Sequence, residues 1–259
     1  MFSRKLKPIF IDNKNLIRLG PNRDGGYIID KRVIKKIDYI ISCGLSDNWD
    51  FEKEFLKLNN KAKIIAFDHT VNSLFWKKKI ISDFFNFFLL KKLSIWKINN
   101  MFKFIDYLLF FRDKNEHFKL KIGKKNINNK EINIRKILNN KKNVLLKVDI
   151  EGDEYEILNH IKSNSNKINC LIIEFHEVRK NLRKINNFTK TIKNLKSIHI
   201  HGNNVKKIDN LGYPYAIECT FINSKIINFR KKKNNKSYPI SDLDFPSVKR
   251  NDDINIVFK

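Results

Sequence analysis

The sequence predicts an α/β protein with a mostly parallel sheet, one antiparallel strand and helices on both faces. Short apolar runs of strand length recur near residues 39, 64, 119, 145, 171, 198 and 216. Segments with helical spacing separate these runs as far as the sixth, which is typical of parallel strands joined by crossover helices. The last two runs are joined by a turn around Gly212 and Pro214, and this connection predicts the antiparallel strand.

The size of the chain fits one domain with additions. It has 259 residues, a mass of 30.9 kDa and 42% hydrophobic residues, enough for one sizeable core. We expect a single domain over residues 1–259. A Phe-rich helical insertion is expected at about 74–116, and an extended C-terminal tail at about 223–259.

The first strand–turn–helix unit has the pattern that opens nucleotide-binding α/β folds. The apolar run 37–43 stops at Gly44, and a helical pattern follows from Phe51. The next strand, 63–67, ends at Asp68, which lies 24 positions after Gly44 (68 minus 44). An acid at this strand tip commonly binds ribose hydroxyls. The turn has one glycine, so the dinucleotide-binding fingerprint is absent.

The segment VLLKVDIEGDEYEIL, residues 144–158, predicts a buried strand, a tight acidic turn and then a helix. One acid would be enough to cap the helix. Two acids, Asp149 and Glu151, precede Gly152, where the backbone allows close approach. This pattern favours a ligand site over a simple cap.

Polar side chains follow the predicted strands at one end of the sheet. The pairs are Gly44 and Asp47, Asp68 and His69, Asp149 and Glu151, Glu174 and His176, and His201 and Asn203. Core packing alone would not favour one end. In open α/β sheets ligands bind beyond the carboxyl ends of the strands, so this clustering predicts an enzyme.

Two further segments have alternative interpretations. Residues 16–30 contain turn chemistry that favours a hairpin or surface loop, and the alternative is a lid whose Arg18, Arg23 and backbone amides face an anion. Residues 74–111 predict two amphipathic helices rich in Phe and interrupted by Lys. We expect these helices to be core or a substrate-covering insertion, and the alternative is peripheral contact with an anionic membrane.

The formal net charge of +26 predicts weak attraction for anions. Lys, Asn, Ile and Phe dominate, as AT-rich codons would produce, and basic residues are spread along the chain. We therefore expect no dedicated nucleic-acid site. Cys43, Cys170 and Cys219 lie in apolar runs without metal-ligand spacing, which fits reduced thiols in the cytoplasm. We identify no secretory signal and no span long enough for a bilayer.

Four segments carry a resemblance to a known family: ISCGLSDNWDFE (41–52), IIAFDHT (64–70), LLKVDIEGDEYEIL (145–158) and LIIEFHE (171–177). They resemble class I S-adenosylmethionine-dependent methyltransferases, specifically the FkbM family. LGPNRDGGY (19–27) and HIHGNN (199–204) resemble a subgroup found beside polysaccharide genes. The resemblance covers most of residues 16–222. It implies a Rossmann-like methyltransferase sheet, S-adenosylmethionine as cofactor and O-methylation of a sugar hydroxyl.

The resemblance also implies roles for individual residues. The Gly44 turn would hold the methionine part of the cofactor, Asp68 the ribose hydroxyls, and Asp149 would lie near the sulfonium. The cofactor set is completed by Cys43, Leu45, Asp47 and His69. The sequence departs from the family at Ser46-Asp47-Asn48, where a second glycine is usual.

For the acceptor we expect contacts from Arg18, Asp24, Tyr27, Glu174, Asn203 and Asn204. A sugar hydroxyl needs a base to take its proton, and the candidates are His176, His201, Glu151 and Asp149. We assign alignment to Asp149 and the base to His176 or His201. Asp149, Glu174 and His176 are of metal-ligand types, but nothing in their spacing requires a divalent metal, so none is assigned.

Two other functions fit parts of the sequence. Acids at strand tips also serve nucleotide-sugar-dependent transferases. A basic chain could instead be a non-catalytic module that binds nucleic acid or membrane. Neither the identity of the acceptor nor the oligomeric state follows from the sequence.

Overall fold

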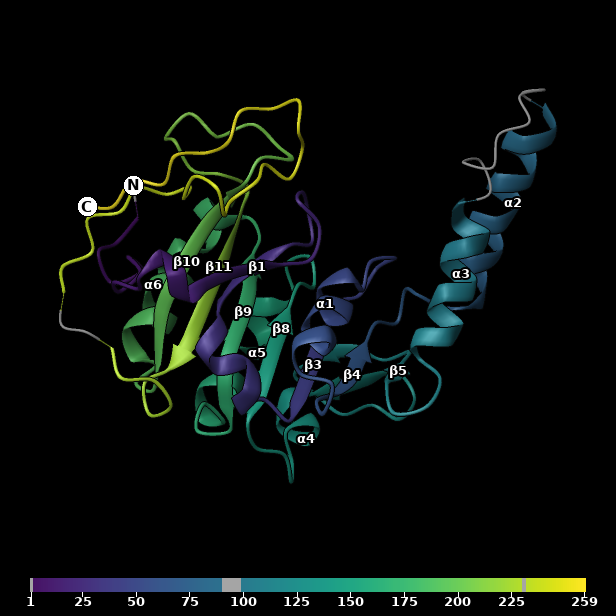
Figure 1. Ribbon diagram of the computed structural model, residues 1–259, viewed down its shortest axis with the longest axis horizontal. Helices are drawn as coiled ribbons and strands as arrows, with labels where there is room; N and C mark the ends of the chain where they lie inside the picture. Colours follow the sequence, from purple (N-terminus) through teal and green to yellow (C-terminus); the bar gives the residue numbers. More distant parts are fainter. Residues whose placement is uncertain (1, 90–98, 230–231) are drawn as a thin grey trace.

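A computed structural model describes residues 2–89, 99–229 and 232–259. Its centre is a seven-stranded sheet with the order β10-β11-β9-β8-β3-β4-β5 (Figure 1). These strands are β3 (Tyr39–Cys43), β4 (Lys63–Phe67), β5 (Glu116–Phe118), β8 (Val144–Val148), β9 (Ile168–Phe175), β10 (Leu195–Asn203) and β11 (Ala216–Asn223). Every neighbouring pair is parallel except the two pairs that contain β11. The predicted fold class is confirmed, including the single antiparallel strand.

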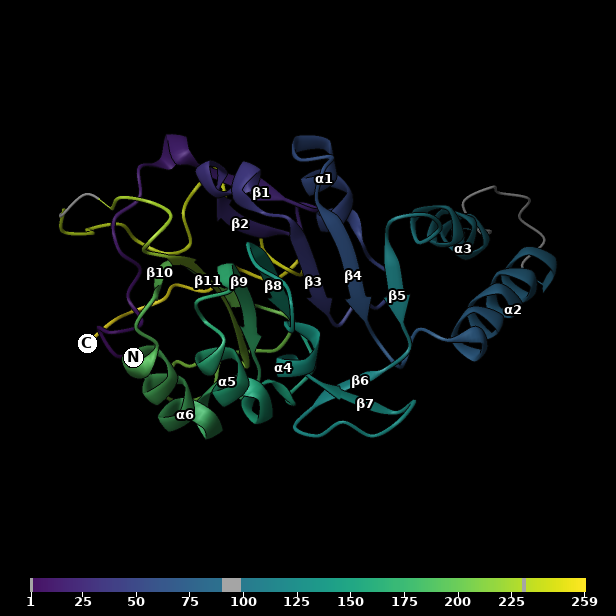
Figure 2. The same ribbon diagram turned by 90° about the horizontal axis from the view of Figure 1, so that it is seen from below.

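Helices cover both faces of this sheet (Figure 2). On one side lies α1, together with the hairpin of β1 and β2, and on the other lie α4, α5 and α6. The bounds are α1 (Asp50–Leu58), α2 (Ser73–Leu89), α3 (Asn99–Phe110), α4 (Ile134–Ile137), α5 (Glu154–Ser163) and α6 (Val178–Thr191), with the 3-10 helices η1 (Asn13–Asn15) and η2 (Lys31–Lys36). Because both faces are covered, β8 and β9 are buried along their whole lengths, which explains their continuous apolar runs.

The segment expected to form one strand at 118–122 is divided between two sheets. Residues 116–118 form β5 at the edge of the central sheet. The chain then turns, with the Leu120 amide donating to the Phe118 carbonyl at 2.8 Å. Beyond the turn, β6 (Lys121–Gly123) pairs with β7 (Glu131–Asn133) in a separate two-stranded sheet. A tight turn inside an apolar run leaves no trace in the hydrophobic pattern.

The segment at 16–30 is an antiparallel hairpin of β1 (Leu16–Leu19) and β2 (Tyr27–Asp30), as the turn chemistry predicts. It lies against the sheet, where the Thr220 hydroxyl donates to the Ile28 carbonyl at 2.7 Å. The last residues return to the beginning of the chain, where the Phe2 amide donates to the Val257 carbonyl at 2.8 Å. The C-terminal segment thus closes over the β10 edge.

The two helices predicted in the insertion are α2 and α3, and they stand away from the sheet beyond β5 (Figures 1 and 2). A separate cluster that includes Trp49, Trp76 and Tyr107 packs their base against the domain. Farther out, large apolar side chains face solvent: Ile81, Phe84, Phe85, Phe102, Ile105, Leu108 and Leu109 are about half exposed or more. The expectation that the insertion is core is wrong for this outer part. Residues 90–98 of the insertion lie outside the described residues.

From the sequence we expect no helix long enough to span a bilayer, and three reduced, buried cysteines. In the described ranges, the helices are too short or too polar to cross a bilayer. Cys43, Cys170 and Cys219 are buried and unpaired, as the apolar runs around them predict.

Candidate active site

The ends of β3, β4 and β8 converge on one cavity. The Gly44 amide donates to the Phe67 carbonyl at 3.0 Å, and the Asp149 amide donates to the Cys43 carbonyl at 2.8 Å. The cavity has a volume of about 740 Å³, the size of a pocket for a nucleoside-sized ligand. Its wall combines Arg23–Gly25, Tyr27, Gly44–Asn48, Phe67–Thr70, Lys103, Leu120–Ile122, Lys147, Asp149–Glu151 and Asp153.

Gly44 shapes the floor of this cavity. Its φ is +85°, in the left-handed region, and a Cβ built there would lie 1.7 Å from the Asp149 carbonyl oxygen. Only glycine fits such a position. The glycine therefore lets two strand ends meet and leaves bare backbone facing the cavity.

Asp68 lies in the cavity wall, but its carboxylate is already used by the protein. Oδ2 accepts the amides of Leu45 and Ser46 at 2.9 and 3.0 Å. Oδ1 accepts the Thr70 amide and hydroxyl at 2.8 and 2.6 Å. Burial raises the pKa of Asp68, yet these hydrogen bonds outweigh it and the pKa is lowered. Four accepted hydrogen bonds fill a carboxylate, so Asp68 holds the Gly44 loop in this structure.

The other residues of the expected cofactor set have different surroundings. Leu45 and His69 line the cavity. The Asp47 carboxylate pairs with Lys79 and, at 3.0 Å, with Lys103, so it ties the loop to the α2–α3 helices. The Cys43 thiol is fully buried outside the cavity lining, and burial raises its pKa. A cofactor contact through the Cys43 side chain is therefore wrong, because the alternation of β3 turns that side chain into the core.

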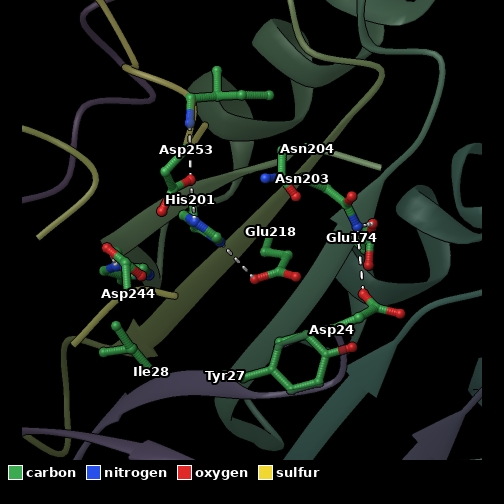
Figure 3. A network of polar contacts seen from close by, with 12 residues as sticks. Asp24, Tyr27, Ile28, Glu174, His201, Asn203, Asn204, Glu218, Asp244 and Asp253 are labelled. Carbon is green, nitrogen blue, oxygen red and sulfur yellow. Dashed lines mark hydrogen bonds and ion pairs between the residues drawn. The ribbon is translucent and has the colours of Figure 1, made fainter. Parts of the chain in front are cut away.

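A row of charged side chains crosses the sheet beside the cavity (Figure 3). The register pairs His201 with Glu218 and Glu218 with Glu174. It also pairs Val148 with Ile173, so the next residues, Asp149 and Glu174, lie side by side. Burial raises the pKa of Glu174 well above its usual range, and the charges of Asp149 and Glu218 raise it further. Acids placed directly opposite each other destabilise a sheet, so this row needs positive charge.

His201 supplies some of that charge and is unsuited to act as a base. Its Nδ1 lies 3.3 Å from Glu218 Oε2, and its Nε2 lies 2.9 Å from Asp253 Oδ1. Burial alone lowers the pKa of His201, but these two acids raise it to about 10. At neutral pH the ring is an imidazolium enclosed by acids, 1% exposed. The assignment of His201 as a base is therefore corrected to a charge that holds Glu218.

His176 is buried outside the cavity lining, among acids from three elements. Its Nε2 is 3.5 Å from Glu151 Oε2 and 3.7 Å from both Asp149 Oδ1 and Glu174 Oε1. Burial lowers the pKa of His176, but neighbouring carboxylates, Glu154 first among them, outweigh burial and raise it. Of the two candidate bases, His176 is the one whose neighbours Asp149 and Glu151 line the cavity.

Asp149 has a shifted pKa at the centre of the site. Burial raises its pKa to about 6, Glu151 and Asp24 add to the rise, and His176 and Lys147 oppose it. The Tyr27 hydroxyl donates to Asp149 Oδ2 at 3.4 Å. Tyr27 and Asp149 thus form the cavity wall between the hairpin and the sheet.

The expected acceptor contacts divide into two groups. Asp24 and Tyr27 line the cavity, and Asn203 lies beside it, donating to Glu174 at 3.0 Å and to Asp24 at 3.5 Å. Arg18 and Asn204 are corrected to structural roles. The Arg18 guanidinium donates to the carbonyls of Pro21, Arg23 and Leu243, which folds the hairpin turn. The Asn204 amide donates to the carbonyls of Val248, Asn251 and Asp252.

Four charged residues of the site were missed from the sequence: Lys147, Glu52, Glu154 and Glu218. Lys147 Nζ lies 2.8 Å from Glu52 Oε1, and both are buried. Glu154 is fully buried and accepts the His176 amide at 2.7 Å. Lys147 and Glu218 each interrupt an otherwise apolar buried strand, and that interruption was the available signal.

The lysines of the cavity wall are all engaged with acids. Lys147 pairs with Glu52, Lys103 with Asp47, and Lys121 with Asp153 at 2.7 Å. The acids Asp24, Asp149 and Glu151 lie at the other end of the wall, where the described residues place no Lys or Arg within ion-pair distance of them. Arg23 also lines the cavity, is exposed and has no acid within ion-pair distance in the described ranges. The acids of the wall are available to a positively charged ligand, although the whole chain is strongly basic.

The comparisons with known proteins bear on the fold. No family model and no curated protein matches the sequence. Similar solved structures include a precorrin-6y C5,15-methyltransferase from Geobacter metallireducens GS-15, with 10% identity, 83% of this chain and 98% of that chain covered, and a TM-score of 0.37. Others are a Methanococcus jannaschii fibrillarin pre-rRNA processing protein (11% identity, 73% and 68% covered, TM-score 0.38) and a Bacillus cereus O-methyltransferase in complex with SAH (8%, 73% and 76%, TM-score 0.36).

These likenesses are too distant to assign a substrate or any residue's role. The order and directions of the strands in this chain are themselves those of the Rossmann-like class I methyltransferase sheet. Membership of the FkbM family stays a prediction.

Proposed function

We propose that this chain is an S-adenosylmethionine-dependent methyltransferase. The observation that carries the proposal is the convergence of three strand ends on one cavity, with the Gly44 backbone bare at its floor. S-adenosylmethionine supplies a methyl group activated on a sulfonium. The residues fit this ligand, because the glycine cradle leaves room for its chain and Asp149 and Glu151 match its positive charge.

The charges of the cavity favour this cofactor over a nucleotide sugar. A diphosphate needs free cations or exposed amides. The lysines of the wall are paired, the amides of Leu45 and Ser46 donate to Asp68, and Arg23 alone among the described cations of the wall has no acid within ion-pair distance. A sulfonium has no such requirement and is attracted by the acids.

For the acceptor we propose a sugar hydroxyl in glycan biosynthesis, on the basis of the FkbM resemblance. Asp24 and Tyr27 on the hairpin line the part of the cavity nearest the acidic row, and polar side chains of this kind bind hydroxyl groups. Methyl transfer mainly requires alignment of the two reactants. The cluster of Asp149, Glu151 and His176 would orient the acceptor oxygen and take up its proton.

Calorimetric titration with S-adenosylhomocysteine tests the cofactor. We expect saturable binding of one equivalent, with a rise in melting temperature, while UDP-glucose gives neither. Binding of UDP-glucose in place of S-adenosylhomocysteine would overturn the proposal in favour of a nucleotide-sugar transferase. Incubation with methyl-labelled cofactor and a panel of sugars, amines and RNA then tests the acceptor, and label on an amine or on RNA alone would overturn the sugar hydroxyl.

We also propose that the outer part of α2 and α3 lies on an anionic membrane surface. The exposed apolar residues of both helices are accompanied by exposed Lys77 and Lys78. This combination fits the interface of a bilayer that contains acidic lipids. Acceptors of glycan biosynthesis carried on lipid would be close to such a surface.

A further inference from the structure

The His176 ring lies in a group of acids and forms only long ion-pair contacts with them. Its Nε2 lies 3.5 to 3.7 Å from oxygens of Asp149, Glu151 and Glu174. A charge-assisted hydrogen bond would bring nitrogen and oxygen to about 2.7–2.9 Å. His176 is 4% exposed, and its contacts through Nε2 are longer than hydrogen bonds. The buried ring nitrogen without a hydrogen-bond partner is Nδ1.

These separations are close to those of ligands that share one metal ion. Nitrogen and oxygen donors lie about 2.0–2.2 Å from a divalent cation. Two such donors are then separated by roughly 3.0–3.6 Å in octahedral or tetrahedral geometry. The ligand atoms of Asp149, Glu151 and His176 all lie within 4.8 Å of one another, so a small inward movement would complete a coordination shell.

The other side of the ring resembles that of a metal-binding histidine in that Nδ1 faces a carboxylate, although Nδ1 has no hydrogen-bond partner. Such a ring commonly directs its second nitrogen toward a carboxylate, which fixes the tautomer and leaves the first nitrogen free for the metal. Glu154 Oε1 lies 3.4 Å from His176 Nδ1. The Glu154 carboxylate is itself fixed, because it accepts the His176 amide at 2.7 Å and the Gly152 amide at 2.8 Å.

The local charge also calls for a cation. Asp149, Glu151 and Glu174 have no Lys or Arg within ion-pair distance in the described part of the chain. Asp24 and Glu218, together with Glu174, form a second group of acids whose oxygens lie within 4.8 Å of one another. His201 is held by Glu218 and Asp253, so His176 is the imidazole that faces Asp149, Glu151 and Glu174.

We propose that Asp149, Glu151 and His176, with Glu174 beside them, bind one divalent first-row transition-metal cation. Imidazole suits Zn²⁺, Cu²⁺, Fe²⁺ or Ni²⁺, while carboxylates suit Mn²⁺ and Mg²⁺. Mn²⁺ is the first-row transition-metal cation that suits the carboxylates and is the probe of choice. The binding itself does not depend on the proposed function. The role does rest on it: the cation would hold the acceptor oxygen beside the cavity and favour loss of its proton to water, and His176 would then be a ligand of the cation in place of the base.

The test is titration of the EDTA-treated, dialysed full chain with MnCl₂. Binding is measured by calorimetry and by the loss of the free Mn²⁺ signal in electron paramagnetic resonance. We expect one saturable site. Glu151→Gln, whose side chain is 84% exposed and therefore leaves the fold intact, and His176→Asn should each weaken binding about tenfold or more. Glu177→Gln changes a neighbouring acid outside the cluster and should bind as the wild type.

Nuclear magnetic resonance tests whether His176 is one of the residues that bind the cation. In protein with labelled histidine, substoichiometric Mn²⁺ should broaden the His176 ring signals before those of the exposed His69. Absence of a saturable site, or a site unchanged by both Glu151→Gln and His176→Asn, would overturn the inference. Binding of S-adenosylhomocysteine in EDTA is measured on the same protein, so the cation site and the proposed function can fail separately.

Discussion

Gly44 and Asp149 meet so closely that the first of them has no room for a side chain. A Cβ at Gly44 would lie 1.7 Å from the Asp149 carbonyl oxygen, and the φ of Gly44 is +85°. The contact joins the ends of β3 and β8 at the floor of the cavity. One glycine therefore determines both the shape of the cavity and the position of an acid in its wall.

Gly44→Ala should therefore destabilise the fold and abolish binding of S-adenosylhomocysteine. We expect the free energy of unfolding to fall by about 3 kcal/mol or more, because main chain must move. Gly212→Ala is the matched control, since Gly212 has a φ of +79° and nothing within 4 Å of a built Cβ; it should cost about 1 kcal/mol. Urea unfolding and calorimetry measure both quantities. Equal losses in the two variants would contradict the contact with Asp149.

Asp68→Asn separates two roles of this acid, holding the Gly44 loop or binding the ligand. The carboxylate accepts four hydrogen bonds from Leu45, Ser46 and Thr70. The NH₂ group of Asn would face N–H or O–H groups that donate to the carboxylate in the wild type. We therefore expect the free energy of unfolding to fall by about 1–3 kcal/mol and ligand binding to weaken. Asp113→Asn, at an exposed acid, should change neither. A loss of affinity at unchanged stability would instead favour direct contact with ribose.

His201 should make stability depend on pH in the alkaline range. Its folded pKa is raised to about 10, against about 6.5 in an unfolded chain. The stabilisation is complete below pH 6.5 and is lost as pH rises toward 10, by about 5 kcal/mol in total. Urea unfolding from pH 6 to 9.5 should show this decline in the wild type and a flatter dependence in His201→Asn. His69→Asn, at an exposed histidine, should keep the wild-type slope.

The sequence predicts those features of the site that depend on local pattern. The period of apolar residues locates β3, β4 and β8, and turn chemistry after each strand locates Gly44, Asp68 and Asp149. Because parallel strands place their carboxyl ends at one edge, these three positions come together.

Features that depend on distant partners could not be predicted in this way. Arg18 donates to the Leu243 carbonyl, and His201 contacts Asp253, since the C-terminal segment folds back over the sheet. Asp47 is drawn to Lys79 and Lys103 by the position of α2 and α3. In each case a polar residue that the local pattern assigns to a ligand is instead satisfied by a segment far away in the sequence.

The outer surface of α2 and α3 gives a last prediction, on membrane contact. Ile81 and Phe85, one helical turn apart on α2, are 53% and 60% exposed. We expect the full chain to float with vesicles that contain phosphatidylglycerol, less with purely zwitterionic vesicles and less again at high salt.

Ile81→Ser combined with Phe85→Ser should lower the floated fraction severalfold, because each side chain loses apolar burial in the interface. Ile208→Ser combined with Leu211→Ser removes similarly exposed apolar residues from the loop between β10 and β11 and should leave flotation unchanged. Equal flotation of both double variants and the wild type would show that charge alone drives attachment. A shift of the wild type to a dimer in solution, abolished by the α2 variant, would show instead that a second copy of the chain covers this face.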